Sequence, residues 1–438
     1  MHWLSRSLPW VGLLAVYACG DDASPRSESA DAGPDAGAQS ETSTGDTGAE
    51  AGTCPQGWVC PAVPVYTSVV GSWYTNIYRI TTDTKAPGYA EAFHWSDCRY
   101  RPSLGTYDSD NVGVLSTHLD QMKAARIDFL MLDGTNGYST TLAYDTDVLI
   151  HTQLKRDPSM RIPIALTLGA QLWANPPGTA SAVPNHQAEV DKGFVDFANN
   201  ATQNFTYAKA LSNTAGAEPI NSVYFKWDSK PLMVVYNPPS PGGNNGIDWM
   251  DPRFTVRRAG SIVNPNAQST KDYGALGWWG WVTEYPQYIS KEAIAVSPGA
   301  DNKHRGCAGC DYALDRENGQ LFIREWLRAI ENNPRVIVIA AWNDNIDETA
   351  IEPASPIAGK GGPAYVDSYG VETPDWYLQI ASAYSNLRTG LMPDNVYRDD
   401  DSTTMFRVTA GKLVAESSFP HNRPVIVLPK GTLANLLR

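Results

Sequence analysis

The chain of 438 residues has few basic side chains and no long apolar run. Lys and Arg together number 34 against 47 Asp and Glu, which leaves a formal net charge of -13 at pH 7. An acidic chain is repelled by phosphate backbones and anionic headgroups, so nucleic acid and an anionic lipid surface are not expected partners. The sequence also has no internal repeat, and no G-x-G-x-x-G follows its first expected strand, which weakens the case for a doubly wound open sheet.

The apolar stretch at the N-terminus, residues 8–18, is too short to span a bilayer comfortably. It follows Arg6 and ends in Val16-Tyr17-Ala18-Cys19, which resembles a bacterial lipobox whose cysteine is lipidated. The alternative is an ordinary signal peptide with an incidental cysteine. We expect residues 1–19 to be a lipoprotein-type signal peptide. The chain is then exported and lipid-anchored to the bacterial cell envelope through Cys19, at the surface or in the periplasm.

Residues 20–53 contain almost no large apolar side chains. Such a segment cannot bury enough surface to offset the entropy lost on ordering, so it is predicted to be a disordered acidic linker. A flexible linker directly after a lipid anchor would hold a folded domain away from the membrane.

Cysteine is scarce in the rest of the chain. The five remaining cysteines are Cys54, Cys60, Cys98, Cys307 and Cys310. Because export implies an oxidising compartment, Cys54 with Cys60 and Cys307 with Cys310 are candidate disulfides, which leaves Cys98 over. Zinc is the rival reading of the C-x-x-C pair, but the sequence has no second such pair and no His pair at ligand spacing. We therefore expect neither a metal nor a cofactor.

Continuous apolar runs rich in β-branched residues recur along the chain, as expected for strands that are covered on both faces. The eight runs span residues 63–70, 127–132, 162–168, 231–236, 254–256, 274–282, 293–296 and 336–341. Amphipathic helices are predicted over residues 114–126, 186–200, 319–331 and 375–387. This alternation predicts an α/β fold, a (β/α)8 TIM barrel over residues 54–398. Short strands at residues 404–408 and 424–428 predict a small C-terminal β appendage over residues 399–438.

Active sites of such barrels lie at the carboxyl ends of the strands. The polar residues expected there are Asp133, Asn237, Glu284, Asp344 and Asp347. Each has a simpler explanation, because a strand-end Asp can cap a helix and an Asn before Pro can make a turn.

Residues 341–353 are different, because they place four carboxylates directly after the most hydrophobic expected strand. Cleavage of a glycosidic bond requires two carboxyl groups, one as proton donor and one as base or nucleophile. Asp344 and Asp347 are three residues apart, so one turn can direct both into one pocket. Repulsion between like charges would raise the pKa of one of them, as a general acid requires.

The run Trp342-Asn343-Asp344, continued by Asp347-Glu348-Thr349-Ala350-Ile351-Glu352-Pro353, resembles a segment of glycoside hydrolase family 99. That family includes endo-α-mannosidases, and family 71 α-1,3-glucanases carry a comparable run. A second stretch, from Trp73-Tyr74 through His94-Trp95 and residues 102–110 to residues 118–128, resembles the same family in the same order.

The resemblance implies catalytic roles for the acidic run. Asp344 takes the place of the glutamate that assists attack by the substrate's own 2-hydroxyl, and Asp347 takes that of the acid/base. Both positions hold Asp where the family has Glu, and Glu348 stands where the family has Gly. In an alternative register Glu348 is the acid.

Aromatic and polar residues near strand ends are the expected substrate contacts. These are Trp73, Tyr74, Asp133, Asn237, Trp281 and Glu284. Trp279 and Trp281 would share one face of an alternating strand, so one face can be core and the other a sugar platform.

The sequence therefore predicts a glycoside hydrolase that cleaves α-linked bonds in an extracellular polysaccharide or oligosaccharide. One alternative is a non-catalytic glycan-binding lipoprotein on a barrel scaffold. Another is a metal-dependent hydrolase with Asp344, Asp347 and Glu348 as oxygen ligands. Nothing in the sequence points to a protein partner.

Overall fold

The structure is a computed structural model of the whole chain. It describes residues 54, 56–60, 65–83, 85, 92–134, 140–168, 223–236, 252, 254–259, 261–262, 279–282, 289–305, 313–367, 369–418 and 423–436. The expected signal peptide, Cys19 and linker lie outside these residues. None of the helices in the described part is both long and apolar enough to cross a membrane.

The central sheet is parallel. Its strands are β1 (Val69–Tyr74), β5 (Phe129–Leu132), β6 (Ile164–Leu168), β8 (Lys230–Tyr236), β9 (Thr255–Ala259), β12 (Ala293–Val296) and β15 (Val336–Ile339). They pair side by side in the order β12, β15, β1, β5, β6, β8, β9, and β7 (Lys226–Trp227) lies antiparallel beside β8. The first strand of the sheet thus lies next to the last, as it does in a barrel.

The predicted α/β fold with a parallel sheet is confirmed, but a closed barrel is not seen in the described part. β10 (Ser261–Ile262) pairs in parallel with β11 (Trp281–Val282), and β11 lies in contact with β12. No hydrogen-bonded ladder joins β11 to β12 among the described residues.

Both faces of the sheet are covered by apolar side chains. The outer face carries large aliphatic residues that pack on helices, such as Leu130, Ile294 and Ile337. The inner face brings one residue or more from each of the seven parallel strands into one cluster. Gly71 fits this inner face because an added Cβ would lie 2.3 Å from Cζ of Phe129.

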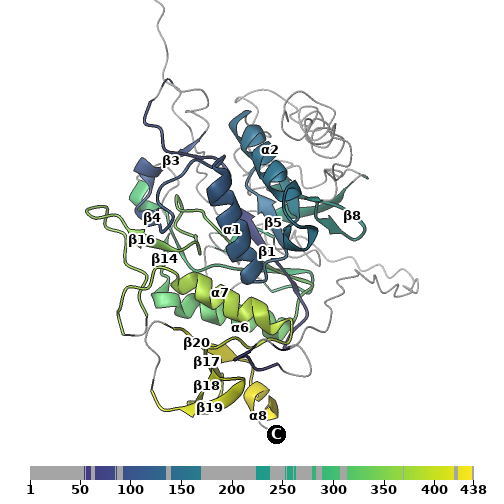
Figure 1. Cartoon of the computed structure of the whole chain (residues 1–438), viewed down its shortest axis with the longest axis vertical. Coiled ribbons are helices and arrows are strands. Elements are labelled where there is room, and N and C mark those ends of the chain that lie inside the picture. The colour runs from purple at the N-terminus through teal and green to yellow at the C-terminus, as the bar shows by residue number, and fades with distance from the viewer. Residues whose placement is uncertain are drawn as a thin grey trace, which may run out of the picture.

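The helices lie outside the sheet (Figure 1). They are α1 (Val112–Ala124), α2 (Thr140–Leu154), α6 (Gln320–Asn332) and α7 (Trp376–Leu387). α1 begins where Asn111 Oδ1 accepts hydrogen bonds from the amides of Gly113 and Val114, at 3.0 and 3.2 Å. α6 ends at Asn333, whose φ of 42° is left-handed.

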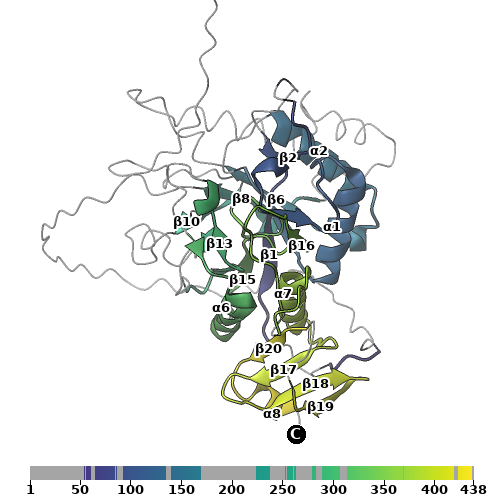
Figure 2. The same cartoon turned by 90° about the vertical axis from the view of Figure 1, so that its left-hand side faces the viewer.

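A four-stranded sheet packs against α6 and α7 at one end of the molecule (Figures 1 and 2). It consists of β17 (Val396–Asp399), β18 (Met405–Thr409), β19 (Lys412–Glu416) and β20 (Val425–Leu428), and α8 (Thr432–Leu436) follows it. The order is β19, β18, β17, β20. β17 crosses the boundary expected between residues 398 and 399.

Short strands complete the described part. They are β2 (Tyr78–Arg79), β3 (Phe93–His94), β4 (Tyr100–Pro102), β13 (Ala300–Asp301), β14 (Ala313–Leu314) and β16 (Ala354–Pro356). β16 directly follows the acidic run and pairs antiparallel with β4, so the two strands form a ribbon.

Several expectations differ from the structure. The first strand begins at Val69, later than expected, because its ladder begins opposite Val336 of β15. Helix α2 was not expected, and the helix expected over residues 186–200 lies outside the described residues. The Cys54–Cys60 disulfide is present, and Cys98 is a buried thiol. Cys307 and Cys310 lie outside the described residues.

Candidate active site

The acidic run forms a loop that folds back on the end of β15. Backbone hydrogen bonds join Ala341 N to Thr349 O at 2.9 Å and Glu352 N to Trp342 O at 2.8 Å. Trp342 N also donates to Trp73 O at 2.8 Å, which ties the loop to the end of β1. The loop therefore holds its carboxylates at the carboxyl edge of the parallel sheet.

Asp344 is buried at this edge, with 5% of its surface exposed. Its carboxylate accepts hydrogen bonds from Asp347 N at 3.1 Å and from Thr349 Oγ1 at 3.4 Å. Burial, and then the negative charges of Asp347 and Asp133, raise the pKa of Asp344 to about 8. Asp344 is thus protonated to a large extent near neutral pH and can donate a proton.

Asp347 has different surroundings, because its side chain is 28% exposed and pairs with Arg305. The distance from Arg305 Nη1 to Asp347 Oδ1 is 3.2 Å. The backbone carbonyl of Asp347 accepts a hydrogen bond from Asp301 N at 2.9 Å. Two aspartates three residues apart therefore differ in burial and in charge partner.

Asp133 follows β5 and is also buried, with 7% of its surface exposed. Its backbone amide donates to Tyr74 O at 2.9 Å, which fixes the chain beside the end of β1. Its negative charge acts on Asp344. The structure thus brings together three of the predicted site residues, Asp133, Asp344 and Asp347.

Glu348, the alternative acid, is held by Arg99. Arg99 Nε and Nη2 contact the two carboxylate oxygens, the second at 2.6 Å, and Nη2 also lies 2.6 Å from Asp301 Oδ2. Glu348 is 3% exposed and has a left-handed φ of 55°. With both oxygens bound to one guanidinium, Glu348 anchors the loop to the segment before β4.

A buried polar network lies between the acidic loop and the segments that pack against it. Glu352 accepts hydrogen bonds from Tyr107 Oη at 3.1 Å and Asn345 Nδ2 at 3.2 Å, and its other oxygen lies 3.1 Å from His118 Nε2. Asn343 Nδ2 donates to Tyr107 Oη at 3.2 Å. Because each of these five side chains has at least one hydrogen-bond partner, the network fixes the loop position.

The segments of the second resemblance supply part of this support. Trp95 stacks on Tyr78 with ring centroids 4.3 Å apart, and its Nε1 donates to Tyr107 O at 2.7 Å. Tyr78 Oη in turn donates to Asn343 O at 3.0 Å. Residues widely separated in the sequence thus meet beneath one loop.

Two predicted substrate contacts have packing roles in the described structure. Trp73 lies in the inner cluster, where its Nε1 donates to Trp279 O at 2.8 Å. Tyr74 faces the opposite side of the sheet, and its Oη lies 3.0 Å from His118 Nδ1. Trp279 is fully buried. Asn237, Glu284 and the side chain of Trp281 lie outside what the structure describes.

Sequence reasoning missed Arg99, Arg305 and Asp301. Arg99 lies directly before β4, Asp301 lies in β13, and Arg305 lies in the short 3-10 helix Lys303–Arg305. No motif marks these residues in the sequence. Within the described ranges, no three His, Cys, Asp or Glu side chains are grouped to hold a metal ion.

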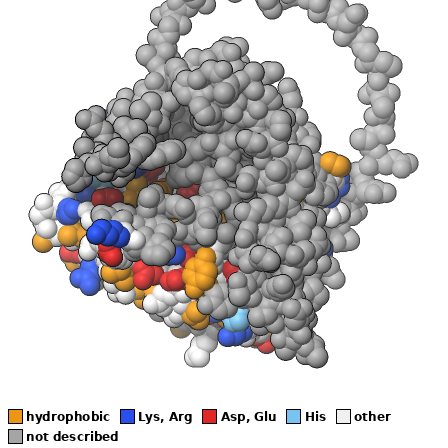
Figure 3. All heavy atoms as spheres, turned by 90° about the horizontal axis from the view of Figure 1, so that it is seen from above, with side chains coloured by type: hydrophobic (Ala, Val, Ile, Leu, Met, Phe, Trp, Pro, Cys, Tyr) orange, Lys and Arg blue, Asp and Glu red, His pale blue; other side chains and the backbone are white. Residues whose placement is uncertain are grey.

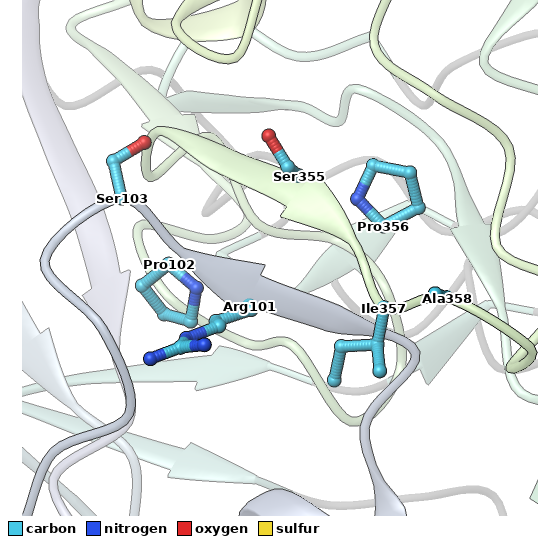
Figure 4. A pocket seen from close by; sticks show the side chains of 7 residues that line it. All are labelled: Arg101, Pro102, Ser103, Ser355, Pro356, Ile357 and Ala358. Carbon is cyan, nitrogen blue, oxygen red and sulfur yellow. The ribbon is translucent and has the colours of Figure 1, made fainter.

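The surface near the ribbon of β4 and β16 carries a pocket of about 290 Å³ (Figure 4). It is lined by Arg101, Pro102, Ser103, Ser355, Pro356, Ile357 and Ala358. None of these is a carboxylate, so this pocket is separate from Asp344. Seen from above, acidic and basic side chains of the described residues intermix with apolar ones and form no patch of a single sign (Figure 3).

Comparison with known proteins gives matches among solved structures alone, because no family model and no curated protein matches this sequence. The chain is similar to a family 99 endo-α-mannosidase from Bacteroides thetaiotaomicron in two structures, one in complex with bis-tris-propane. Identity is 17% and 16%, the TM-score is 0.46 in both, and each match covers 75% of this chain and 99% of that one. A glycoside hydrolase-like protein matches at 15% identity and a TM-score of 0.43, over 73% of this chain and 94% of that one. At these values the likeness assigns neither fold nor activity to this chain.

Proposed function

We propose that the chain is a glycoside hydrolase that acts on α-linked polysaccharide or oligosaccharide, with Asp344 as proton donor and Asp347 as base or nucleophile. One observation carries the proposal: Asp344 is buried beside Asp347 and Asp133 at the carboxyl edge of a parallel sheet. Acid and base roles for two carboxylates require different environments. Asp344 is buried, whereas Asp347 is partly exposed and pairs with Arg305.

This assignment reverses the roles that the sequence resemblance implies. There Asp344 corresponds to the base and Asp347 to the acid/base. The raised pKa of Asp344 favours its protonated form, as a proton donor requires, and Asp347 is partly exposed and pairs with the Arg305 guanidinium. We leave Glu348 out of the chemistry, because Arg99 engages both of its oxygens.

The test is hydrolysis of a panel of α- and β-linked polysaccharides by the full chain and by Asp344→Asn, Asp347→Asn and the control Asp120→Asn. Asp120 pairs with Arg156 at the exposed surface of α1, so its variant removes one carboxylate far from the sheet edge. We expect a loss of about 10²–10⁴ in kcat for either site variant and no loss for the control.

Aryl glycosides with acidic leaving groups separate the two roles. Such substrates need little protonation, so Asp344→Asn should cleave them far better than polysaccharide, whereas Asp347→Asn should cleave neither. The opposite pattern would restore the roles implied by the resemblance. Full activity in both variants would remove both residues from the mechanism, and glycan binding without hydrolysis by the parent would favour the non-catalytic alternative.

We also propose that the sheet closes into an eight-stranded barrel between β11 and β12. The contact between these strands supports closure, as does the inner cluster, in which Ala259 of β9 and Ala293 of β12 share one core although they lie at opposite ends of the sheet order.

Export and lipid anchoring through Cys19 remain proposals supported by the residues before Cys54. Labelling with a radioactive fatty acid should mark the parent in a bacterial host and not Cys19→Ser. Equal labelling of both would reject the anchor.

A further inference from the structure

A second cavity, of about 490 Å³, lies away from the acidic loop, beside α7. Its lining includes Trp58, Gln379, Ser382, Asp394, Asn395 and Arg423. This volume falls within the range of about 300–1,000 Å³ that small-ligand sites occupy. None of the lining residues belongs to the segments that carry Asp133, Asp344 or Asp347.

Trp58 is half-buried at this cavity, and its backbone is fixed on both sides. The Cys54–Cys60 disulfide closes the loop that contains it, and Val59 exchanges two backbone hydrogen bonds with Met392, of 3.1 and 2.7 Å. The hairpin turn at Gly411 lies so close to the Trp58 backbone that a Cβ added to Gly411 would lie 3.0 Å from Trp58 O. A backbone held in this way restricts the positions open to the Trp58 side chain, which lowers the entropy lost when a ligand binds.

The other lining groups are mainly polar and close to neutral in sum. Arg423 pairs with Asp394 at 3.0 Å and also donates to its backbone carbonyl at 2.8 Å, so the one cation of the lining is matched by its one anion. Gln379 donates from Nε2 to Asp375 Oδ1 at 3.0 Å, which directs its amide along α7. Asn395 is 6% exposed, and its Oδ1 accepts from Val396 N at 2.8 Å.

We propose that this cavity binds a neutral saccharide unit, as a second carbohydrate site separate from the carboxylates. The apolar C–H face of a sugar ring fits an indole face, and amide, hydroxyl and ion-paired groups around it match ring hydroxyls. A charged ligand is disfavoured, because Asp394 and Arg423 already neutralise each other. Such a site would hold one part of a long polysaccharide while another part of the same polymer reaches the acidic loop. Binding at the cavity would then raise the effective concentration of the polymer at the loop.

The test measures binding apart from hydrolysis, in the full chain carrying Asp344→Asn. Migration is followed in native gels that contain mannan, α-1,3-glucan, dextran, starch or galactomannan, with Trp58→Ala, Trp58→Tyr and Gln379→Leu added in turn. Tyr369→Ala removes an aromatic side chain that is 48% exposed elsewhere and serves as the matched control.

We expect at least one polysaccharide to slow the chain. Trp58→Ala should weaken its apparent affinity about threefold to tenfold, as loss of one aromatic contact does. Gln379→Leu should weaken it in the same direction, and Trp58→Tyr and Tyr369→Ala should leave it nearly unchanged. Because Gln379 lies on the surface of α7, its variant keeps the test decisive even if Trp58→Ala disturbs the fold.

The proposal is overturned if no polysaccharide in the panel slows the chain, or if Trp58→Ala and Gln379→Leu both bind as the parent does. Its failure is distinct from failure of the proposed hydrolase activity. With Asp344 intact, Trp58→Ala should cleave a short aryl glycoside at the parental rate, so binding and cleavage are scored independently.

Discussion

Asp344 and Asp347 have the same side chain, and only their surroundings separate their proposed roles. Asp344 is desolvated and faces two negative charges, whereas Asp347 reaches solvent and pairs with Arg305. Because Asp344 must be protonated to donate, kcat/KM should fall as the pH rises through about 8. A pH profile from 5 to 10 checks this, and Asp344→Asn should lose that alkaline limb.

Burial and the charges of Asp347 and Asp133 raise the pKa of Asp344 most strongly, and the positive charge of Arg305 lowers it by a smaller amount. Replacing Arg305 by Gln removes this charge, so the pKa of Asp344 should rise and the alkaline limb should move to higher pH. Arg305→Lys keeps the charge and should keep the limb near its parental position. A limb that stays in place in Arg305→Gln would show that another group controls it.

Strand-end position in the sequence is enough to predict that Asp133 and Asp344 lie at the carboxyl edge of the sheet, and spacing is enough to predict that Asp347 lies near Asp344. The partners that distinguish them could not be predicted. Arg99 lies directly before the short strand β4, and Arg305 lies in the single turn of 3-10 helix Lys303–Arg305. The positions of such short elements depend on contacts with distant segments and not on local periodicity. The face to which Tyr74 points could not be predicted either, because adjacent residues of a strand point to opposite faces and only the register shows which face is inside.

At the level of elements, α6 contains a fully buried carboxylate, Glu325, on a face otherwise apolar. It accepts a hydrogen bond from Ser297 N, just after β12, at 2.5 Å. Burial raises the pKa of Glu325 from 4.5 to about 8. The folded protein therefore retains a proton that the unfolded chain releases, and this contribution to stability is lost as the pH rises from about 4.5 to about 8.

Glu325→Gln cannot ionise, so its melting temperature should decline less than that of the parent between pH 6 and pH 9. Scanning calorimetry at both pH values measures the difference. Parallel declines in the two proteins would show that Glu325 does not ionise in the folded state within this range.

A cluster of charged side chains lies at the end of the sheet opposite the acidic loop. Glu292, just before β12, accepts hydrogen bonds from Arg257 Nε at 2.9 Å, Trp227 Nε1 at 2.8 Å and Arg335 Nη1 at 3.0 Å. Arg335 also lies over the Trp227 ring, 4.2 Å from its centroid. This cluster is remote from the acidic loop, so its role is to stabilise the sheet.

Glu292→Ala leaves the buried Arg257 without its main partner and should lower the free energy of unfolding by about 3 kcal/mol. Urea denaturation measures this loss, and kcat at a temperature where the variant is folded should stay unchanged. Glu292→Gln, which keeps the volume and one acceptor, should lose less. A fall in kcat with unchanged stability would assign the cluster to catalysis instead.

The apolar periodicity of the sequence predicted helices and strands well where the buried face of the element consists of apolar residues. α6 and β12 lie within a residue or two of their expected bounds, because each has a continuous buried face. α2 was missed because its buried side includes polar residues such as Asp145 and Gln153, which pair with Arg79 and with the backbone of Ile162. Polar residues satisfied by distant partners break the pattern on which such predictions rest.

On the scale of the whole molecule, the C-terminal sheet shares its core with the rest of the chain. Val427 of β20 accepts from Tyr384 Oη of α7 at 2.8 Å, and Ile426 and Leu428 belong to the large outer cluster with α6 and α7. A boundary at residue 398 could be expected from the change in pattern, but the sequence does not show that the two parts pack together.

A chain that ends at residue 398 would expose the faces of α6 and α7 that β20 covers. We expect it to be insoluble or to melt at least 10 °C lower than the full chain, because a continuous core is cut. Soluble yield and thermal denaturation test this. A truncated chain as stable as the parent would show that the C-terminal sheet folds independently of α6 and α7.

The Cys54–Cys60 loop has a mechanical consequence. If the chain before Cys54 is anchored and the folded part is pulled, tension reaches Cys54 and passes through the disulfide directly to Cys60. The five residues between them carry no load, so Trp58 and the pair of Val59 and Met392 are shielded from the pull. The cross-link thus keeps tension between Cys54 and the folded part out of the five-residue loop that contains Trp58.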